Sequence, residues 1–283
     1  MSDVAIHDEL TLPTLVIEPS RGWVSLRLRE LWDYRELLFF LAWRDVTVRY
    51  KQAALGVAWA VLQPLLTMVI FSVIFGQLAR LPSDGIPYPV FSYVALLPWQ
   101  LFAGALQRAG TSLVGNANLL TKVYFPRLII PISAVAAGLV DFAIAFVVLL
   151  GLMLWYKITP TWAILWLPLL VVLALLTALA VGLWLSALNV QYRDVQHAIP
   201  FLIQAWMYAS PVAYSAGLIP SGKWRILYGL NPLAGVIQGF RWALLGGKPP
   251  DELMLVSVVM VIVLLVTGLF YFRRMERTFA DVV

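Results

Sequence analysis

Cysteine is absent from this sequence, and histidine is almost absent. The lack of cysteine among 283 residues excludes disulfides, thiol catalysis and cysteine-based metal sites. The two histidines, His7 and His197, lie far apart in the sequence, so we expect no metal site. No phosphate-binding loop of the form GxxxxGK[ST] occurs either. We therefore expect no catalytic residues and no cofactor in this chain.

Charge is the second deficit. Only 12% of the residues are charged and 61% are hydrophobic, and the mean hydropathy is +0.86. A soluble domain has about a quarter charged residues, so this composition indicates an integral membrane protein. The net charge of +5 favours membrane topology over nucleic acid as its cause, because the basic residues cluster between the apolar runs.

Six apolar runs are long enough, or nearly so, to cross a bilayer as helices, which takes roughly 20 residues. We predict an all-α membrane fold with spans at 57–79, 90–106, 128–156, 162–190, 198–215 and 253–272. Five of these runs contain proline, which a membrane helix tolerates where neighbouring groups satisfy the freed carbonyl.

The stretch 216–252 is apolar but interrupted by glycine and proline. Two helical pieces, at about 223–230 and 232–245, are too short to cross singly. We interpret them as an interfacial or re-entrant hairpin on the outer side before the last span. Two further spans made from this stretch are the alternative.

The distribution of the 20 lysines and arginines orients the chain. With six spans both termini lie on one side, and most basic residues fall on that side. The outer side holds only Arg80, Lys157, Lys223, Arg225, Arg241 and Lys248. Both termini are therefore predicted to be cytoplasmic.

Three regions follow along the chain. Residues 1–20 carry acidic residues but no lysine or arginine and are predicted to be a flexible cytosolic tail. Residues 21–52 contain an amphipathic helix with apolar positions spaced by three or four. That helix suits the inner membrane interface, and packing on the protein's own core is equally compatible. Residues 53–283 form the transmembrane domain.

Asp141 is the one ionisable residue well inside a predicted span. Such residues are costly in a membrane and are often functional. Asp141 is either a helix-packing acceptor for a neighbouring hydroxyl or amide, or a pore or proton-path group. A single carboxylate is little evidence for a carrier that is driven by an ion gradient. Any active transport is thus expected to depend on a partner.

Aromatic residues are numerous, and several lie mid-span. A conduit for sugar chains would use them, because the C–H face of a sugar packs on an aromatic ring; core packing is the alternative for each. The candidates are Trp59, Phe71, Tyr93, Trp99, Phe102, Trp206 and Tyr208. A stripe of small residues, Ala178, Gly182 and Ser186, allows close helix approach within one chain or between two.

Several motifs together resemble one family. They are WRDVTVRYKQ at 43–52 with LGVAW at 55–59, NANLLTKVYFPR at 116–127, NVQYRDV at 189–195, LNPL at 230–233 with GFR at 239–241, and FRRMERTFAD at 272–281. In order and spacing they resemble the ABC-2-type permeases that export polysaccharides, with teichoic acid exporters as relatives. The resemblance runs from about residue 23 to the end.

The resemblance implies a homodimeric channel in the bacterial inner membrane with two copies of a separate ATPase subunit, which would bind ATP and magnesium. The substrate would be a lipid-linked polymer such as O-antigen. ATPase-coupling residues by position would be Arg44, Arg49, Tyr50, Lys51, Asn116, Leu119, Lys122, Tyr124, Phe125 and Arg127. Asn116 or Asn118 would cap a short helix that Pro126 ends.

Three other functions compete with this one. A drug or small-molecule exporter of the same permease class is the main alternative. A membrane-embedded enzyme would need clusters of carboxylates or histidines near an interface, and none is visible in the sequence. A structural scaffold is the last alternative.

Overall fold

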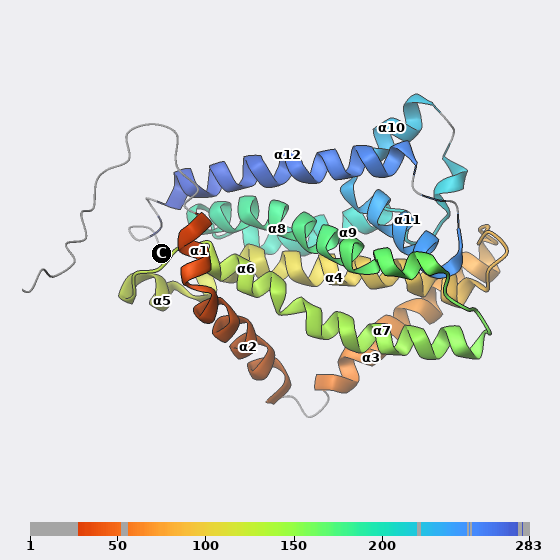
Figure 1. Cartoon of the computed structure of the whole chain (residues 1–283), viewed down its shortest axis with the longest axis horizontal. Helices are drawn as coiled ribbons and strands as arrows, with labels where there is room; N and C mark the ends of the chain where they lie inside the picture. The colour runs from red at the N-terminus through yellow and green to blue at the C-terminus, as the bar shows by residue number, and fades with distance from the viewer. Residues whose placement is uncertain are drawn as a thin grey trace, which may run out of the picture.

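The computed structural model describes residues 28–51, 56–219, 222–247, 249, 251–276 and 279, and these form an all-helical bundle without strands (Figure 1). Five helical segments within this part are long and apolar enough to cross a membrane. They are Ala58–Leu78, Tyr88–Gly115, Ile129–Trp155, Trp162–Gln191 and Glu252–Met275. The predicted tail 1–20 lies outside the described residues.

The spans consist of the following elements. The first is α3 (Gly56–Phe71) with a π-helical continuation, η1 (Ser72–Leu78), and the second is α4 (Tyr88–Gly115). The third is α6 (Ile129–Ala136) followed by α7 (Gly138–Trp155). The fourth is η2 (Trp162–Trp166) with α8 (Leu167–Gln191), and the last is α12 (Glu252–Met275).

The second span is longer than predicted. The prediction placed it at 90–106, which stops two residues before a charge, Arg108. Helix α4 continues to Gly115, because Arg108 forms an ion pair with Asp141 of α7 at 3.4 Å. A charge with a partner is tolerated inside a membrane bundle, whereas an isolated one is not.

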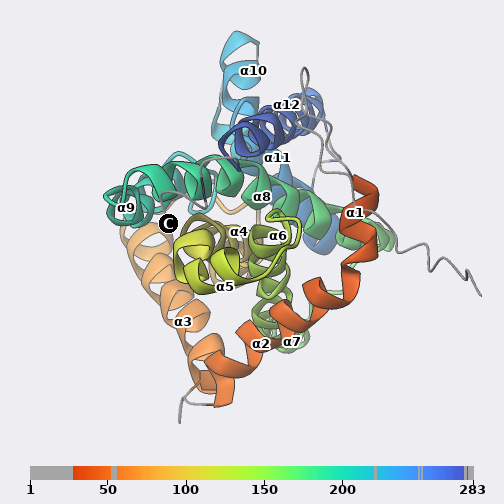
Figure 2. The same ribbon diagram turned by 90° about the vertical axis from the view of Figure 1, so that its left-hand side faces the viewer.

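Helix α4 is the central element of the bundle (Figure 2), and its closest partner is α8. The stripe of small residues on α8 faces it: Ala178 and Gly182 are buried, and a Cβ placed on Gly182 would lie 2.6 Å from the Cβ of Ala109. The stripe therefore mediates helix packing within one chain.

Replacement of Gly182 by alanine is expected to destabilise the bundle by about 1–3 kcal/mol, because the added methyl group overpacks the α4–α8 contact. The measurement is the midpoint of thermal unfolding in detergent. Gly151→Ala on α7 is the matched control, since a Cβ there meets no atom within 4 Å. A Gly182→Ala protein as stable as this control would contradict the packing role.

The predicted span 198–215 is only partly helical. Helix α9 (Val195–Tyr208) has 14 residues and is followed by irregular chain and the short η3 (Ala216–Leu218). Side chains satisfy three successive carbonyls of the irregular part: Arg241 donates to Val212 and Tyr214, and the Tyr88 hydroxyl donates to Ala213. Non-helical backbone within a bundle needs such donors.

The segment from α9 to η3 nevertheless joins the two ends of the bundle. Its start is tied to the end of α8, where the Gln196 amide donates to the side chain of Asn189. Residue 213, in contrast, meets Tyr88 at the first residue of α4. This course is what a sixth pass requires, although the count of six spans stays a prediction.

The two helical pieces expected before the last span are present as α10 (Lys223–Gly229) and α11 (Pro232–Leu245). Helix α11 is buried against α4, α8 and α12. At the turn between the two helices, the Ser257 hydroxyl of α12 donates to the carbonyls of Gly229 and Asn231. The hairpin thus enters the bundle beside α12, as a re-entrant element would.

The amphipathic segment forms α1 (Leu28–Asp33) and α2 (Arg35–Lys51), which lie across the end of the bundle that carries α5 (Ala117–Lys122) and the last turn of α12 (Figure 1). Leu41 is buried in a cluster with Phe125 and Ile129, so the helix packs on the protein's own core. Its opposite face exposes Trp32, Phe39 and Trp43. Exposed aromatic side chains suit a membrane interface. One face of the segment therefore fits the interpretation as a core-packed helix, and the opposite face fits the interpretation as an interface helix.

Candidate functional site

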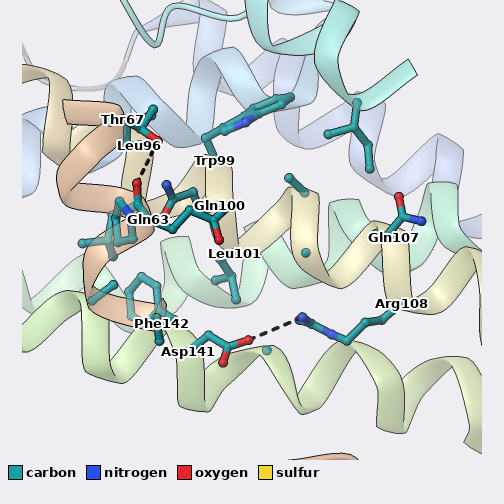
Figure 3. Close-up of a pocket in the computed structure, with 18 of the residues that line it drawn as sticks. Gln63, Thr67, Leu96, Trp99, Gln100, Leu101, Gln107, Arg108, Asp141 and Phe142 are labelled. Atoms are coloured by element: carbon teal, nitrogen blue, oxygen red, sulfur yellow. Dashed lines mark hydrogen bonds and ion pairs between the residues drawn. The ribbon is translucent and has the colours of Figure 1, made fainter. Parts of the chain in front are cut away.

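A cavity of about 950 Å³ lies between α3, α4, α7 and α9, and Figure 3 shows residues of its walls. Arg49 and Tyr50 on the last turn of α2 also line it. Its walls combine amide, aromatic and ionic side chains. The amides are Gln63 on α3, Gln100 and Gln107 on α4, and Gln204 on α9. Such a lining offers both donors and acceptors of hydrogen bonds within a largely apolar frame.

The ionic part of the cavity is centred on Asp141. Its carboxylate accepts hydrogen bonds from Arg49 and from the Tyr50 hydroxyl, both on the last turn of α2, and it pairs with Arg108 of α4. Burial, and then the hydrogen bond to Asp141, raise the pKa of Tyr50 to about 12, so the hydroxyl keeps its proton at neutral pH. Asp141 is thus an acceptor for a hydroxyl, as one interpretation held, and also the partner of two arginines.

Two glycines make room for the Arg108 guanidinium. A Cβ on Gly138 would lie 2.3 Å from Arg108 Nη2, and one on Gly104 would lie 3.1 Å from Nη1. Arg108 Nε also donates to the carbonyl of Ala134 at 3.1 Å. The local sequence therefore places a guanidinium between α4 and α7, where larger side chains would exclude it.

The seven aromatic residues that were predicted to line a substrate path lie in different environments in the structure. Trp59, which is 56% exposed, and the buried Trp99 line the cavity. Phe71, Tyr93 and Phe102 are buried core side chains of this chain, which was the alternative for each. Trp206 packs on the ring of Phe102 at 5.1 Å and donates to Asn231, and Tyr208 is 62% exposed.

Known membrane transporters resemble this chain in sequence. A sequence profile of ABC-2 type transporters matches residues 36–245. The chain belongs to that family. Among relatives of this permease, an O-antigen export system permease protein of Myxococcus xanthus is 32% identical over 254 residues, which are 88% of this chain and 96% of the relative.

Two further relatives extend this likeness. An O-antigen export system permease protein of Klebsiella pneumoniae is 29% identical over 262 residues, which are 92% of this permease and all of the relative. A polysialic acid transport protein of Escherichia coli is 26% identical over 249 residues, 83% of this permease and 91% of the relative. The permease therefore matches these relatives over nearly their whole length.

The loop 116–127 of the permease, which follows α4, presents an exposed tip at residues 121–124. Lys122 and Tyr124 of the predicted coupling set lie on it, and Tyr124 is 78% exposed. Phe125 instead anchors the loop in the core, and Leu119 is half-buried. Lys51 is exposed at the end of α2. The geometry leaves Lys51, Lys122 and Tyr124 as the coupling candidates that a partner subunit can reach.

Asn116 does not cap α5 with its side chain, which corrects the sequence prediction. It occupies the N-cap position, but its amide oxygen accepts from Arg44 at 2.9 Å and its amide nitrogen donates to the carbonyl of Ser112. Helix α5 also ends at Lys122, before Pro126. Arg44 and Asn116 therefore join α2 to the loop 116–127.

Arg127 is committed to the C-terminal end of the permease. Its guanidinium donates to the carbonyl of Glu276, and its backbone amide contacts the carboxylate of the same residue. The guanidinium carbon also lies 6.0 Å from the ring centroid of Phe279. The predicted coupling residue thus has a structural role in holding the loop 116–127 against the end of α12.

The sequence reasoning missed the polar face of α4. Gln100, Gly104, Gln107 and Arg108 recur at helical spacing and line one wall of the cavity. Gln63 and Thr67 do the same on α3. A search for polar residues at this spacing inside apolar runs would have found them, whereas a search for ionisable groups alone did not.

Proposed function

We propose that this permease moves a lipid-linked polysaccharide of the O-antigen type from the cytosol across the bacterial inner membrane. In this proposal two permease chains form the conduit, and two copies of a separate ATPase subunit bind ATP and magnesium. Both termini of the permease then lie in the cytoplasm, with α5 facing the ATPase.

The lining of the cavity is the observation that carries the proposal. Four glutamines offer donors and acceptors for sugar hydroxyls, and Trp59, Trp99 and Phe142 offer ring faces for the apolar side of a sugar. Two arginines against a single carboxylate make the cavity positive, which disfavours the hydrophobic cations that a drug exporter of this class would carry. The relatives named for O-antigen export and polysialic acid transport agree with this chemistry.

The arrangement suggests how ATP hydrolysis would act on the conduit. Closure of the ATPase pair would press on the exposed tip 121–124, which continues through Phe125 into the packed start of α6. The same movement would reach α2 through the hydrogen bond between Arg44 and Asn116. In this proposal the hairpin of α10 and α11 acts as a lid on the outer side.

The proposal is tested by reconstituting the permease with its ATPase in liposomes that carry a lipid-linked glycan. We expect ATP-dependent appearance of the glycan on the side opposite the ATPase, read with a membrane-impermeant lectin. The control is a partner ATPase that cannot hydrolyse ATP because the lysine of its phosphate-binding loop is substituted. With this partner we expect no glycan on the opposite side. Transport of a hydrophobic cation dye with no glycan movement would replace this proposal by the drug exporter.

A further inference from the structure

The strongest unexplained feature is the convergence of two guanidiniums and one hydroxyl on Asp141. The side chains of Arg49, Arg108 and Asp141 are 33%, 22% and 32% exposed, and all three border the cavity. They are therefore accessible to a ligand inside it. A buried structural ion pair would instead be enclosed.

The donors exceed what one carboxylate needs. Among the residues that line the cavity, Arg49 and Arg108 carry two positive charges against the single negative charge of Asp141, which leaves the lining with an excess of one. The Arg108 Nη1–Asp141 Oδ2 distance of 3.4 Å is long for a charge-assisted hydrogen bond. The Arg108 guanidinium is thus held close to its partner but is weakly bound by it.

Phosphate is the acceptor that best matches this donor set. A guanidinium binds phosphate oxygens in the same two-pronged way as a carboxylate, and a phosphate group has more oxygens and more negative charge. A tyrosine hydroxyl that keeps its proton supplies a third donor. A diphosphate would neutralise both arginines, which Asp141 alone cannot do.

We propose that Arg49, Tyr50 and Arg108 form a subsite for a phosphate or diphosphate group, and that the ligand displaces Asp141 from them. This inference rests on the proposed function, because it names the headgroup that the cavity takes. It places the phosphate at the α2 end of the cavity. The amide and aromatic side chains of the walls then contact the sugars, among them Gln63, Trp99 and Gln100.

The exchange has a mechanical consequence. Arg49 and Tyr50 are on α2, whereas Asp141 is on α7, so these contacts tie the interface helix to the third span. A ligand that replaces Asp141 releases α2 from α7 while it holds α2 against α4 through Arg108. Ligand binding in the cavity thereby changes the contacts of α2, and α2 also contacts the loop 116–127 through Arg44.

The test measures equilibrium binding of radiolabelled farnesyl diphosphate to the full chain in phosphatidylcholine nanodiscs, with farnesol as the control for the apolar tail. We expect Arg49→Gln and Arg108→Gln each to raise Kd at least tenfold, and Tyr50→Phe to raise it about threefold. Asp141→Asn should lower Kd, because the competing carboxylate is gone. Arg193→Gln, an exposed arginine outside the cavity, is the matched control and should bind like the wild type.

Inorganic pyrophosphate as a competitor separates two sources of the phosphate. Competition by pyrophosphate at concentrations close to the Kd of farnesyl diphosphate assigns the subsite to free phosphates. Competition only at concentrations at least a hundredfold higher assigns it to a lipid headgroup, and no competition at any concentration would overturn the subsite. If the arginine variants misfold, the opposite shifts of Tyr50→Phe and Asp141→Asn decide. Wild-type affinity in Arg49→Gln and Arg108→Gln, or weaker binding by Asp141→Asn, would overturn the subsite.

The outcome is independent of the test of function. Absence of farnesyl diphosphate binding in a permease that exports glycan would remove the subsite and leave the function standing. Tight, arginine-dependent binding in a permease that moves no glycan would remove the function instead.

Discussion

Charge reversal at Lys122 is expected to abolish ATP-driven export and the stimulation of the partner ATPase while leaving the permease folded. Lys122 is exposed at the end of α5, on the tip that the proposed partner would contact. A glutamate there replaces attraction to an acidic partner surface by repulsion, which costs several kcal/mol across an interface. We therefore expect at least a tenfold loss of stimulated ATPase activity.

The measurement is ATP hydrolysis by the reconstituted complex with and without the permease, together with the midpoint of thermal unfolding. Lys157→Glu is the matched control, because Lys157 is exposed in the loop between α7 and η2, at the opposite end of the bundle. Arg127→Glu should behave differently from both: it places a carboxylate beside Glu276 and is expected to lower the unfolding temperature. Normal coupling in Lys122→Glu would remove α5 from the interface.

Replacement of Arg241 by methionine is expected to destabilise the permease by about 3 kcal/mol and to loosen the outer hairpin. The Arg241 side chain donates to the carbonyls of Tyr214 and Val212 at 2.9 and 3.0 Å, and its guanidinium carbon lies 3.8 Å from the ring centroid of Phe91. Methionine fills the space of the aliphatic stem but leaves the buried carbonyl of Val212 and the part-buried carbonyl of Tyr214 without a donor, at about 1–3 kcal/mol for a fully buried group and less for the other. The lost cation–π contact adds to this, and relief from burying a charge offsets part of it.

The expected readout is a lower unfolding temperature and faster backbone hydrogen exchange at residues 209–219 and 231–245. Arg225→Met, on α10 of the same hairpin, is the matched control. Its ion pair with Asp251 is partly exposed and should contribute no more than about 1 kcal/mol. Equal effects of the two substitutions would show that the Arg241 contacts do not anchor the hairpin.

Much of the architecture was predictable, because it depends on local patterns. The hydrophobic length of 162–190 and 253–272 predicts spans that the structure places at Trp162–Gln191 and Glu252–Met275. The glycine and proline positions around α10 and α11 predict two short helices with nearly the observed bounds. In a membrane the backbone must satisfy its own hydrogen bonds, so long apolar runs have little choice other than a helix.

The predictions failed where distant residues compensate for one another. The second span seemed to end before Arg108, because its partner Asp141 is distant in sequence. The fifth span seemed continuous, although Arg241 and Tyr88 supply the donors that an irregular segment needs. In both cases a tertiary contact offsets a free-energy cost that the local sequence alone would predict. The cost is that of an unpaired charge in the second span and of carbonyls without donors in the fifth.

The sequence by itself determined that this chain is a membrane bundle of the ABC-2 type without a phosphate-binding loop, because composition, periodicity and motif order are properties of the chain alone. Only the tertiary structure decided which polar residues share a cavity. Arg49, Arg108 and Asp141 come from three helices, and no spacing within one helix predicts that they meet. It also decided that Tyr93 and Phe102 belong to the core, because a ring on a membrane helix faces a cavity or a neighbouring helix according to how the helices pack.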